Sequence, residues 1–365
     1  MKTWLWTLLA IAGGYAAYRH WLAPGEESIP PEGPAPLEAA APPVPEPGQP
    51  TARSRPPIAL EIGERDAPKA DGPAEQLAAE WRGALARGDA EGARGTADRI
   101  LAEAPESDAA RWVHYERGRE ALRRYAEAGK TNEGLVHARV AWVELTPVLF
   151  ARDLAAAERD ELRSRLRQLA QDLLFTRHVE GMDRSHVPKR GDSLSVLCRK
   201  VFPQWGTKVS PGLLVEINRL GSATNLRAGV AIRVPLGEPR IVIVKSEFRL
   251  YFLFGGGYVQ DFPVGLGREG TTPEGAFVIE ELIRNPDWHP RAGVIIPFGD
   301  PRNILGTRWL AFKDTADHQG FGIHGTTEPA SIGKEASSGC IRMLRDDVER
   351  VFEWTPRGTP VTILR

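Results

Sequence analysis

The sequence predicts a multidomain protein with an all-α middle region, a small α+β domain and a mainly-β C-terminal domain. Residues 74–178 are nearly free of proline and carry apolar residues at helical spacing. Residues 185–236 contain two helical runs between two short strand-like runs. Residues 240–365 contain short β-branched runs separated by glycine and proline, which is typical of β-structure. A length of 365 residues agrees with two or three such domains.

The composition excludes several function classes. The chain is 42% hydrophobic and 26% charged, with a formal net charge of −1. We therefore expect no nucleic-acid partner, because no global positive field would attract one. The two cysteines, Cys198 and Cys340, make neither a disulfide framework nor a metal site. We expect two free thiols, and neither a metal nor an organic cofactor.

Residues 1–23 have the pattern of an export segment. Lys2 precedes sixteen mostly apolar residues, near the lower limit for a membrane span. Aromatic residues flank the run, as is common at membrane interfaces: Trp4, Trp6, Tyr18 and Trp21. A cleaved signal peptide and an uncleaved signal-anchor both fit, and we favour the anchor. Either one predicts that the rest of the chain is exported, and an anchor would hold it at the cytoplasmic membrane.

Residues 24–73 are predicted to form a disordered linker, since fourteen of these fifty residues are proline. Such a segment has too little apolar surface to offset the entropy lost on ordering. It could be a tether that reaches from the membrane to the cell wall, or a spacer without a specific length.

The middle region, 74–178, begins with two short helices. Leu77, Trp81 and Leu85 lie on one helical face, and residues 88–90 open a second helix that closes before Pro105. This pair resembles a degenerate tetratricopeptide unit. Further helices are predicted over residues 108–128, 132–144 and 154–175, the last with a stripe of Leu162, Leu166, Leu169 and Leu173. A module that binds a protein partner and a self-packed spacer bundle both remain open.

Residues 185–236 are predicted to fold as strand, helix, helix and strand. Asp192 or Ser193 can cap the first helix, on which Cys198 occupies the inner face. The Gly-Asp-Ser-Leu run at 191–194, Asn218 and the closing run at 226–235 resemble a lysin-motif (LysM) domain. The resemblance implies binding to glycan strands that contain N-acetylglucosamine.

The C-terminal domain, 240–365, is predicted to contain six strands. They cover residues 241–245, 249–254, 258–263, 276–283, 309–312 and 361–364.

The chemistry of this domain centres on Cys340 and on His324, sixteen residues upstream. A thiol becomes a nucleophile as its thiolate, which an adjacent base can generate. Gly325 and Gly339 flank the two residues, and glycine lets backbone approach a reacting carbonyl closely. Backbone N–H groups before a nucleophile can form an oxyanion hole. The alternative is a buried structural cysteine beside a chance histidine.

The same stretch resembles the catalytic motif of L,D-transpeptidases of the YkuD type. Residues 324–326, Ser337 and 339–343 match that motif, whereas Ser338 stands where the family has histidine. The resemblance extends over about 125 residues, through the runs at 263–267, 271–277, 305–308, 347–348 and 358–363.

The resemblance implies a role for each matching residue. Cys340 would be the nucleophile and His324 its base, with the Gly325 carbonyl orienting the imidazole. The backbone N–H groups of Ser338 and Gly339, with that of Cys340, would form the oxyanion hole. Arg342 would meet a substrate carboxylate, although a structural salt bridge remains open.

The implied function is that of an exported cell-wall enzyme. It would acylate Cys340 with a peptidoglycan stem peptide and pass the acyl group to an amine, which cross-links the wall. Water as acceptor would make it an L,D-carboxypeptidase or a cross-link hydrolase. Ser338 motivates a third alternative, a catalytically weak peptidoglycan-binding scaffold.

Overall fold

The computed structural model describes residues 72–365, except residues 106, 152, 177 and 292. The expected export segment, 1–23, and all but the last two residues of the expected linker, 24–73, lie outside the described residues. Within the part of the chain that is described, no helix is long and apolar enough to cross a membrane.

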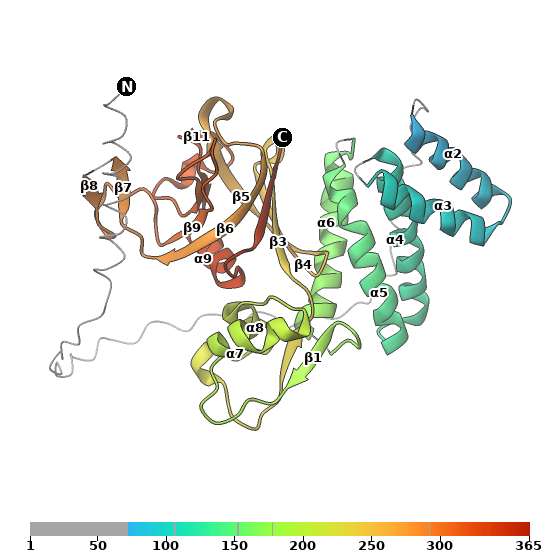
Figure 1. Cartoon of the computed structure of the whole chain (residues 1–365), viewed down its shortest axis with the longest axis horizontal. Coiled ribbons are helices and arrows are strands. Elements are labelled where there is room, and N and C mark those ends of the chain that lie inside the picture. The colour runs from blue at the N-terminus through green and yellow to red at the C-terminus, as the bar shows by residue number, and fades with distance from the viewer. Residues whose placement is uncertain (1–71, 106, 152, 177, 292) are drawn as a thin grey trace, which may run out of the picture. The chain divides into compact units, whose positions relative to one another are not determined.

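The region is helical, as the sequence predicts, with different bounds for the last helix (Figure 1). Its helices are α2 (Pro73–Ala86), α3 (Ala90–Glu103), α4 (Asp108–Ala128), α5 (Asn132–Leu145) and α6 (Ala156–Ala170). The side chains of Asp89, Ser107 and Thr131 cap the starts of α3, α4 and α5 by accepting backbone N–H hydrogen bonds. The helix predicted over 154–175 ends earlier, because a π-helical turn, Gln171–Thr176, follows α6.

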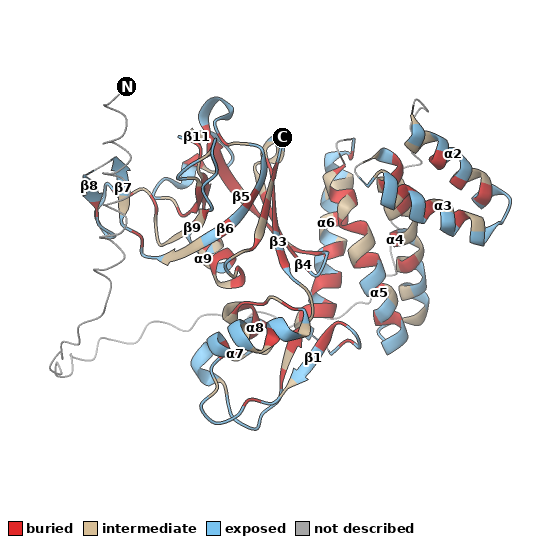
Figure 2. Ribbon diagram, in the orientation of Figure 1, coloured by how far each residue is buried: buried red, intermediate tan, exposed pale blue. Residues whose placement is uncertain are grey.

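The predicted leucine stripe, which runs along α6 into the π-helical turn, is buried, as expected of a core face, whereas Leu85 of α2 is 49% exposed. Helices α2 and α3 and the start of α4 share a small separate core. The later part of α4, with α5 and α6, instead shares one continuous core with the β-domain. Figure 2 shows the buried residues of these helices in red. Because they belong to the same core as the β-domain, the helices are not packed on themselves alone.

Trp142 of α5 packs against strand β5 of the sheet. Its indole N–H donates to the carbonyl of Tyr258, whose own N–H donates to the Thr146 hydroxyl at 2.8 Å. The indole also fills the space above Gly257, where a Cβ would lie 2.1 Å from a ring atom. A polar contact adds to this packing, since Arg167 of α6 lies 2.7 Å from the Asp261 carboxylate, whose side chain is 3% exposed.

The small region, 185–236, has the predicted order of elements. Strands β1 (Asp183–His186) and β2 (Ile232–Pro235) pair antiparallel, with α7 (Leu194–Lys200) and α8 (Pro211–Ile217) between them. Ser193 caps α7 through Val196 N–H. The Asn218 side chain joins the end of α8 to β2 by exchanging hydrogen bonds with the backbone of Arg233.

The C-terminal domain is a β-barrel. Its strands are β3 (Pro239–Val244), β4 (Arg249–Phe254), β5 (Gly257–Gly267), β6 (Gly275–Arg284), β9 (Arg308–Phe312), β10 (Gly322–His324), β11 (Glu335–Ser337), β12 (Ile341–Met343) and β13 (Pro360–Leu364). In the described part of the chain their order is β11-β5-β12-β10-β9-β6-β13-β3-β4, and β4 also pairs with β5. This last pairing closes the sheet.

A β-hairpin and a helix lie outside the closed sheet. Strands β7 (Trp288–Arg291) and β8 (Val294–Ile296) form a separate hairpin. Helix α9 (Arg345–Trp354) follows β12 and contacts the small region, where the Ser210 hydroxyl donates to the Glu353 carbonyl at 2.6 Å. The Trp354 indole donates to Glu216 of α8 at 2.8 Å. The small region is thereby joined to the helix that directly follows the cysteine motif.

Candidate functional site

Two short neighbouring strands position the predicted pair. Strands β10 and β12 run parallel, with Ile323 opposite Ile341 and His324 opposite Arg342. Cys340 directly precedes β12, so it lies at the start of one strand while His324 lies at the end of the other. The sheet therefore brings the two sequence-predicted residues to neighbouring strands of the barrel.

The Cys340 thiol is held by backbone groups. Its Sγ donates to the carbonyl of Gly320 at 3.7 Å. Burial raises the pKa of this thiol, while a hydrogen bond from the Gly322 backbone and the charge of Arg342 lower it. Burial is the largest of these influences, so the thiol is protonated at neutral pH.

The His324 ring is buried, at 2% exposure, and its Nδ1 faces the Gly325 carbonyl oxygen at 2.5 Å. This is the contact that the family resemblance implies for Gly325, and its role in orienting the ring during catalysis stays a prediction. Burial lowers the pKa of His324 to about 4; the Gly325 and Ile304 carbonyls oppose this effect, and Arg342 adds to it. The imidazole is therefore neutral at neutral pH. In the described structure, the hydrogen bonds of the thiol and of this ring run to backbone groups and not to each other.

The loop before Cys340 is shaped by Ser337. The N–H of Gly339 donates to the Ser337 hydroxyl at 3.1 Å, and this hydroxyl donates to the Cys340 carbonyl at 2.7 Å. The Gly339 N–H, which the family resemblance implies as an oxyanion donor, is therefore engaged by Ser337 in this structure, and its role as an oxyanion donor stays a prediction. A serine hydroxyl two residues upstream reaches this N–H through a local turn. Ser338 itself is exposed.

Thr272 is a site residue that the sequence reasoning missed. Its side chain is fully buried, and its Oγ1 donates to the Gly339 carbonyl and accepts from Gly267 N–H, both at 2.8 Å. A Cβ on Gly267 would lie 2.7 Å from the Gly339 Cα. The run at 271–277 belongs to the family resemblance, but nothing in the sequence alone gave Thr272 a role of its own.

Arg342 is 9% exposed, and its Nη1 lies 2.9 Å from a carboxylate oxygen of Glu328. This ion pair is the structural alternative left open by the sequence. Contact with a substrate carboxylate stays a prediction.

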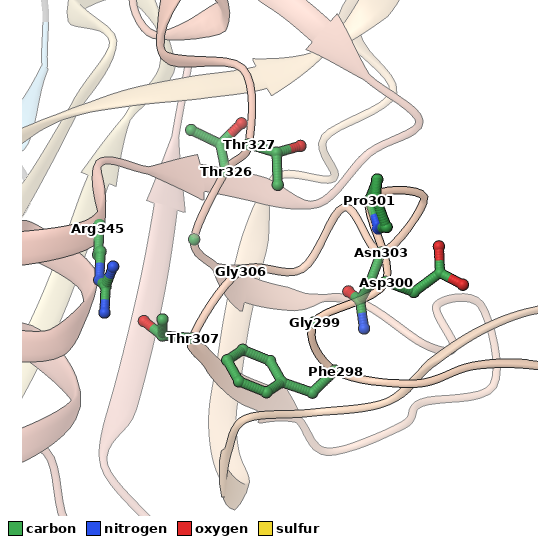
Figure 3. Close-up of a pocket in the computed structure, with 11 residues that line it drawn as sticks. Phe298, Gly299, Asp300, Pro301, Asn303, Gly306, Thr307, Thr326, Thr327 and Arg345 are labelled. Carbon is green, nitrogen blue, oxygen red and sulfur yellow. The ribbon is translucent and has the colours of Figure 1, made fainter.

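A pocket of about 290 Å³ lies next to the His324 loop (Figure 3). Gly325 and Thr326 form part of its wall, opposite the segment that carries Phe298 and Asp300. The carbonyl that holds the His324 ring thus belongs to a residue that lines a cavity large enough for a small peptide group.

Comparison with known proteins identifies the family. A model of the L,D-transpeptidase catalytic domain (YkuD) matches residues 238–363. The chain is 36% identical over 130 residues to the putative L,D-transpeptidase YqjB of Bacillus subtilis, covering 35% of this chain and 72% of that protein. It is 33% identical over 184 residues to the putative L,D-transpeptidase YkuD of the same organism, covering 48% of this chain and 96% of that protein. Among solved structures, an L,D-transpeptidase from Mycobacterium smegmatis aligns at 19% identity with a TM-score of 0.30, covering 38% of this chain and 64% of that one.

These comparisons place the protein in a class of cysteine-dependent enzymes. The chain belongs to the L,D-transpeptidase family of peptidoglycan cross-linking enzymes. The family model begins at residue 238, so the lysin-motif and tetratricopeptide resemblances of the preceding regions stay predictions.

Proposed function

We propose that Cys340 is the nucleophile that attacks the carbonyl of an L-centre, such as that of meso-diaminopimelate, in a peptidoglycan stem peptide. The thiol sulfur forms a thioester bond as the peptide bond to D-Ala breaks, and the thiol proton leaves with the D-Ala amine. An amine of a second stem then attacks the thioester and restores the thiol. The observation that supports this proposal is the parallel pairing of β10, which ends at His324, with β12, which directly follows Cys340.

His324 acts as the proton carrier. Its pKa of about 4 keeps the ring neutral, so it can accept the thiol proton at neutral pH. The ring's hydrogen bonds to the Gly325 and Ile304 backbone favour the protonated form, because an imidazolium has two N–H donors. For the His324 ring to reach Sγ, it gives up its hydrogen bond to one of these carbonyls and forms one with the thiol. Gly325 is then the partner that orients the ring during proton transfer.

The backbone N–H groups of Ser338, Gly339 and Cys340 are assigned to the oxyanion, and the Gly339 N–H exchanges the Ser337 hydroxyl for it. The serine in place of the family's histidine supplies the same backbone donor. Arg342 receives a carboxylate of the donor peptide, because a guanidinium matches a carboxylate in charge and geometry.

Amine transfer and hydrolysis share one acyl-enzyme, so L,D-carboxypeptidase or cross-link hydrolase activity is the alternative outcome. The test incubates the full chain with a stem tetrapeptide, with and without an amine acceptor, and identifies products by mass spectrometry. A cross-linked product supports transfer, and a shortened tripeptide alone supports hydrolysis. No turnover by the wild type would favour the scaffold alternative.

We also propose that the enzyme works outside the cytoplasm, anchored by its N-terminal segment, with residues 185–236 bound to glycan strands. The predicted order of elements in this region supports glycan binding. Sedimentation with purified sacculi tests it: the full chain should pellet, and a chain lacking 185–236 that folds but pellets equally would contradict it. A protein partner for the helical region is a weaker proposal, since α5 and α6 already pack on the barrel.

A further inference from the structure

The ion pair between Arg342 and Glu328 is unequal in burial. The Arg342 side chain is 11% exposed and that of Glu328 is 68% exposed. The Arg342 Nε is buried without a hydrogen-bond partner. The contact with the Glu328 carboxylate is made by Nη1, at the outer end of the guanidinium. The cation is therefore fixed within the site, while its anionic partner lies in solvent.

The position of Glu328 is set by its backbone. Its N–H donates to the Thr326 hydroxyl at 3.0 Å, and its carbonyl accepts from the Ser331 N–H at 2.9 Å and the Ser331 hydroxyl at 2.6 Å. These hydrogen bonds hold the turn without help from the carboxylate. The carboxylate can leave Arg342 while the turn remains intact.

Arg342 is also close to the reacting groups. It pairs in register with His324, and its charge acts on both His324 and Cys340. A carboxylate that binds Arg342 is therefore carried next to the thiol. Glu328 already supplies such a group from the protein side.

We propose that the Glu328 carboxylate occupies the place on Arg342 that a carboxylate of the acyl donor takes, so that Glu328 sets specificity by competing with the substrate. A donor with a free carboxylate replaces Glu328 and leaves Arg342 paired. A donor with a carboxamide leaves the Arg342–Glu328 pair in place. The inference rests on the proposed function, in which Arg342 receives a donor carboxylate.

Two carboxylates belong to the residues that form the scissile bond of a stem tetrapeptide. One ends the leaving D-Ala residue, and the other belongs to the side chain of the diamino acid. Four synthetic donors separate them: the free diacid, the terminal amide, the side-chain amide and the double amide.

The experiment measures acylation of the full chain by intact mass for wild type, Glu328→Gln and a control, Glu335→Gln. Glu335 is an exposed carboxylate at the start of β11, seven residues after Glu328. We expect Glu328→Gln to lower KM for the diacid roughly two- to fivefold, as for release of an exposed ion pair. KM for the double amide should not change. One of the two singly amidated donors should show no decrease in KM in Glu328→Gln. The carboxylate that is blocked in that donor is the one that Arg342 binds.

Alkylation by iodoacetamide, which is neutral, reports the reactivity of the thiol apart from substrate recognition. Its rate corrects for any change in thiolate content caused by loss of the Glu328 charge. Three outcomes would overturn the inference. They are an equal decrease in KM for the double amide in Glu328→Gln, a decrease in KM for the diacid in Glu335→Gln, and an unchanged KM for the diacid in Glu328→Gln. Failure of every donor to acylate the wild type would instead overturn the proposed function, and this inference with it.

Discussion

The hydroxyl of Thr272 donates a hydrogen bond to the carbonyl of Gly339, 2.8 Å away, and so ties the loop after β5 to the residue before the cysteine. The same hydroxyl accepts from the N–H of Gly267, the last residue of β5. One buried side chain therefore joins a long barrel strand to the nucleophile loop. Thr272 thus contacts the residue that directly precedes Cys340, although the two lie far apart in the sequence.

Replacing Thr272 with valine keeps the shape and removes the hydroxyl. Two buried backbone groups lose their partner, so the free energy of unfolding should fall by about 1–3 kcal/mol. The acylation rate by a stem tetrapeptide should fall roughly ten- to a hundredfold, because the nucleophile loop shifts. Denaturant unfolding and acylation kinetics measure the two effects. Thr272→Ser should restore both, and wild-type acylation by the valine variant would contradict the positioning role.

Stability should depend on pH through His324. The folded pKa is about 4 against an ordinary value of 6.5, so between these values the unfolded chain binds a proton that the folded chain does not. This contribution therefore lowers stability as pH falls from 6.5 towards 4, and is absent above that window. Proton NMR of the ring should show a neutral His324 at pH 5. A ring already charged at pH 6 would refute this reading.

Much of the fold could be predicted because its long elements carry clear periodicity. The α4 helix, Asp108–Ala128, has the predicted bounds, and so does β4, Arg249–Phe254. The strands β10 and β12 could not be predicted, since each has three residues and lies in a run rich in glycine and serine. Period-two alternation needs more residues than that to be visible.

The candidate site also contains residues that the sequence reveals and residues that it does not. Cys340 and His324 were visible because thiol chemistry restricts the residue types at such a motif. Glu328 and Thr272 were not, because an exposed glutamate and a threonine in a turn are common, and only the folded chain shows what they contact. The engagement of the Gly339 N–H also depends on a turn geometry that spacing does not reveal.

The helical region should be required for a stable barrel. Trp142 is 1% exposed and packs on Gly257, so Trp142→Ala should lower the free energy of unfolding by about 3–5 kcal/mol. Leu85→Ala is a suitable control in the same region, because Leu85 is 49% exposed. Denaturant unfolding followed by far-UV circular dichroism makes the comparison. Similar losses in both variants would mean that the helix-to-barrel contact contributes little.

Serine at position 338 should make the thiol less reactive at neutral pH. A histidine there would add positive charge near Sγ when protonated, which lowers a thiol pKa. Ser338→His should therefore raise the iodoacetamide rate near pH 6 and shift its pH profile towards acid. Superimposable profiles would show that the side chain at this exposed position does not influence the thiol. An inert wild type beside an active variant would mean that serine has switched the site off.

The most direct test of the account is the intact mass of the full chain after incubation with a stem tetrapeptide. Three proteins are compared: wild type, Cys340→Ala and Cys198→Ala. Burial raises the pKa of the Cys198 thiol to about 12, so this thiol should not react. We predict an adduct with the mass of the tetrapeptide less D-Ala on the wild type and on Cys198→Ala, and no adduct on Cys340→Ala. The same adduct on Cys340→Ala, or none on the wild type, would contradict the assignment of Cys340 as the nucleophile.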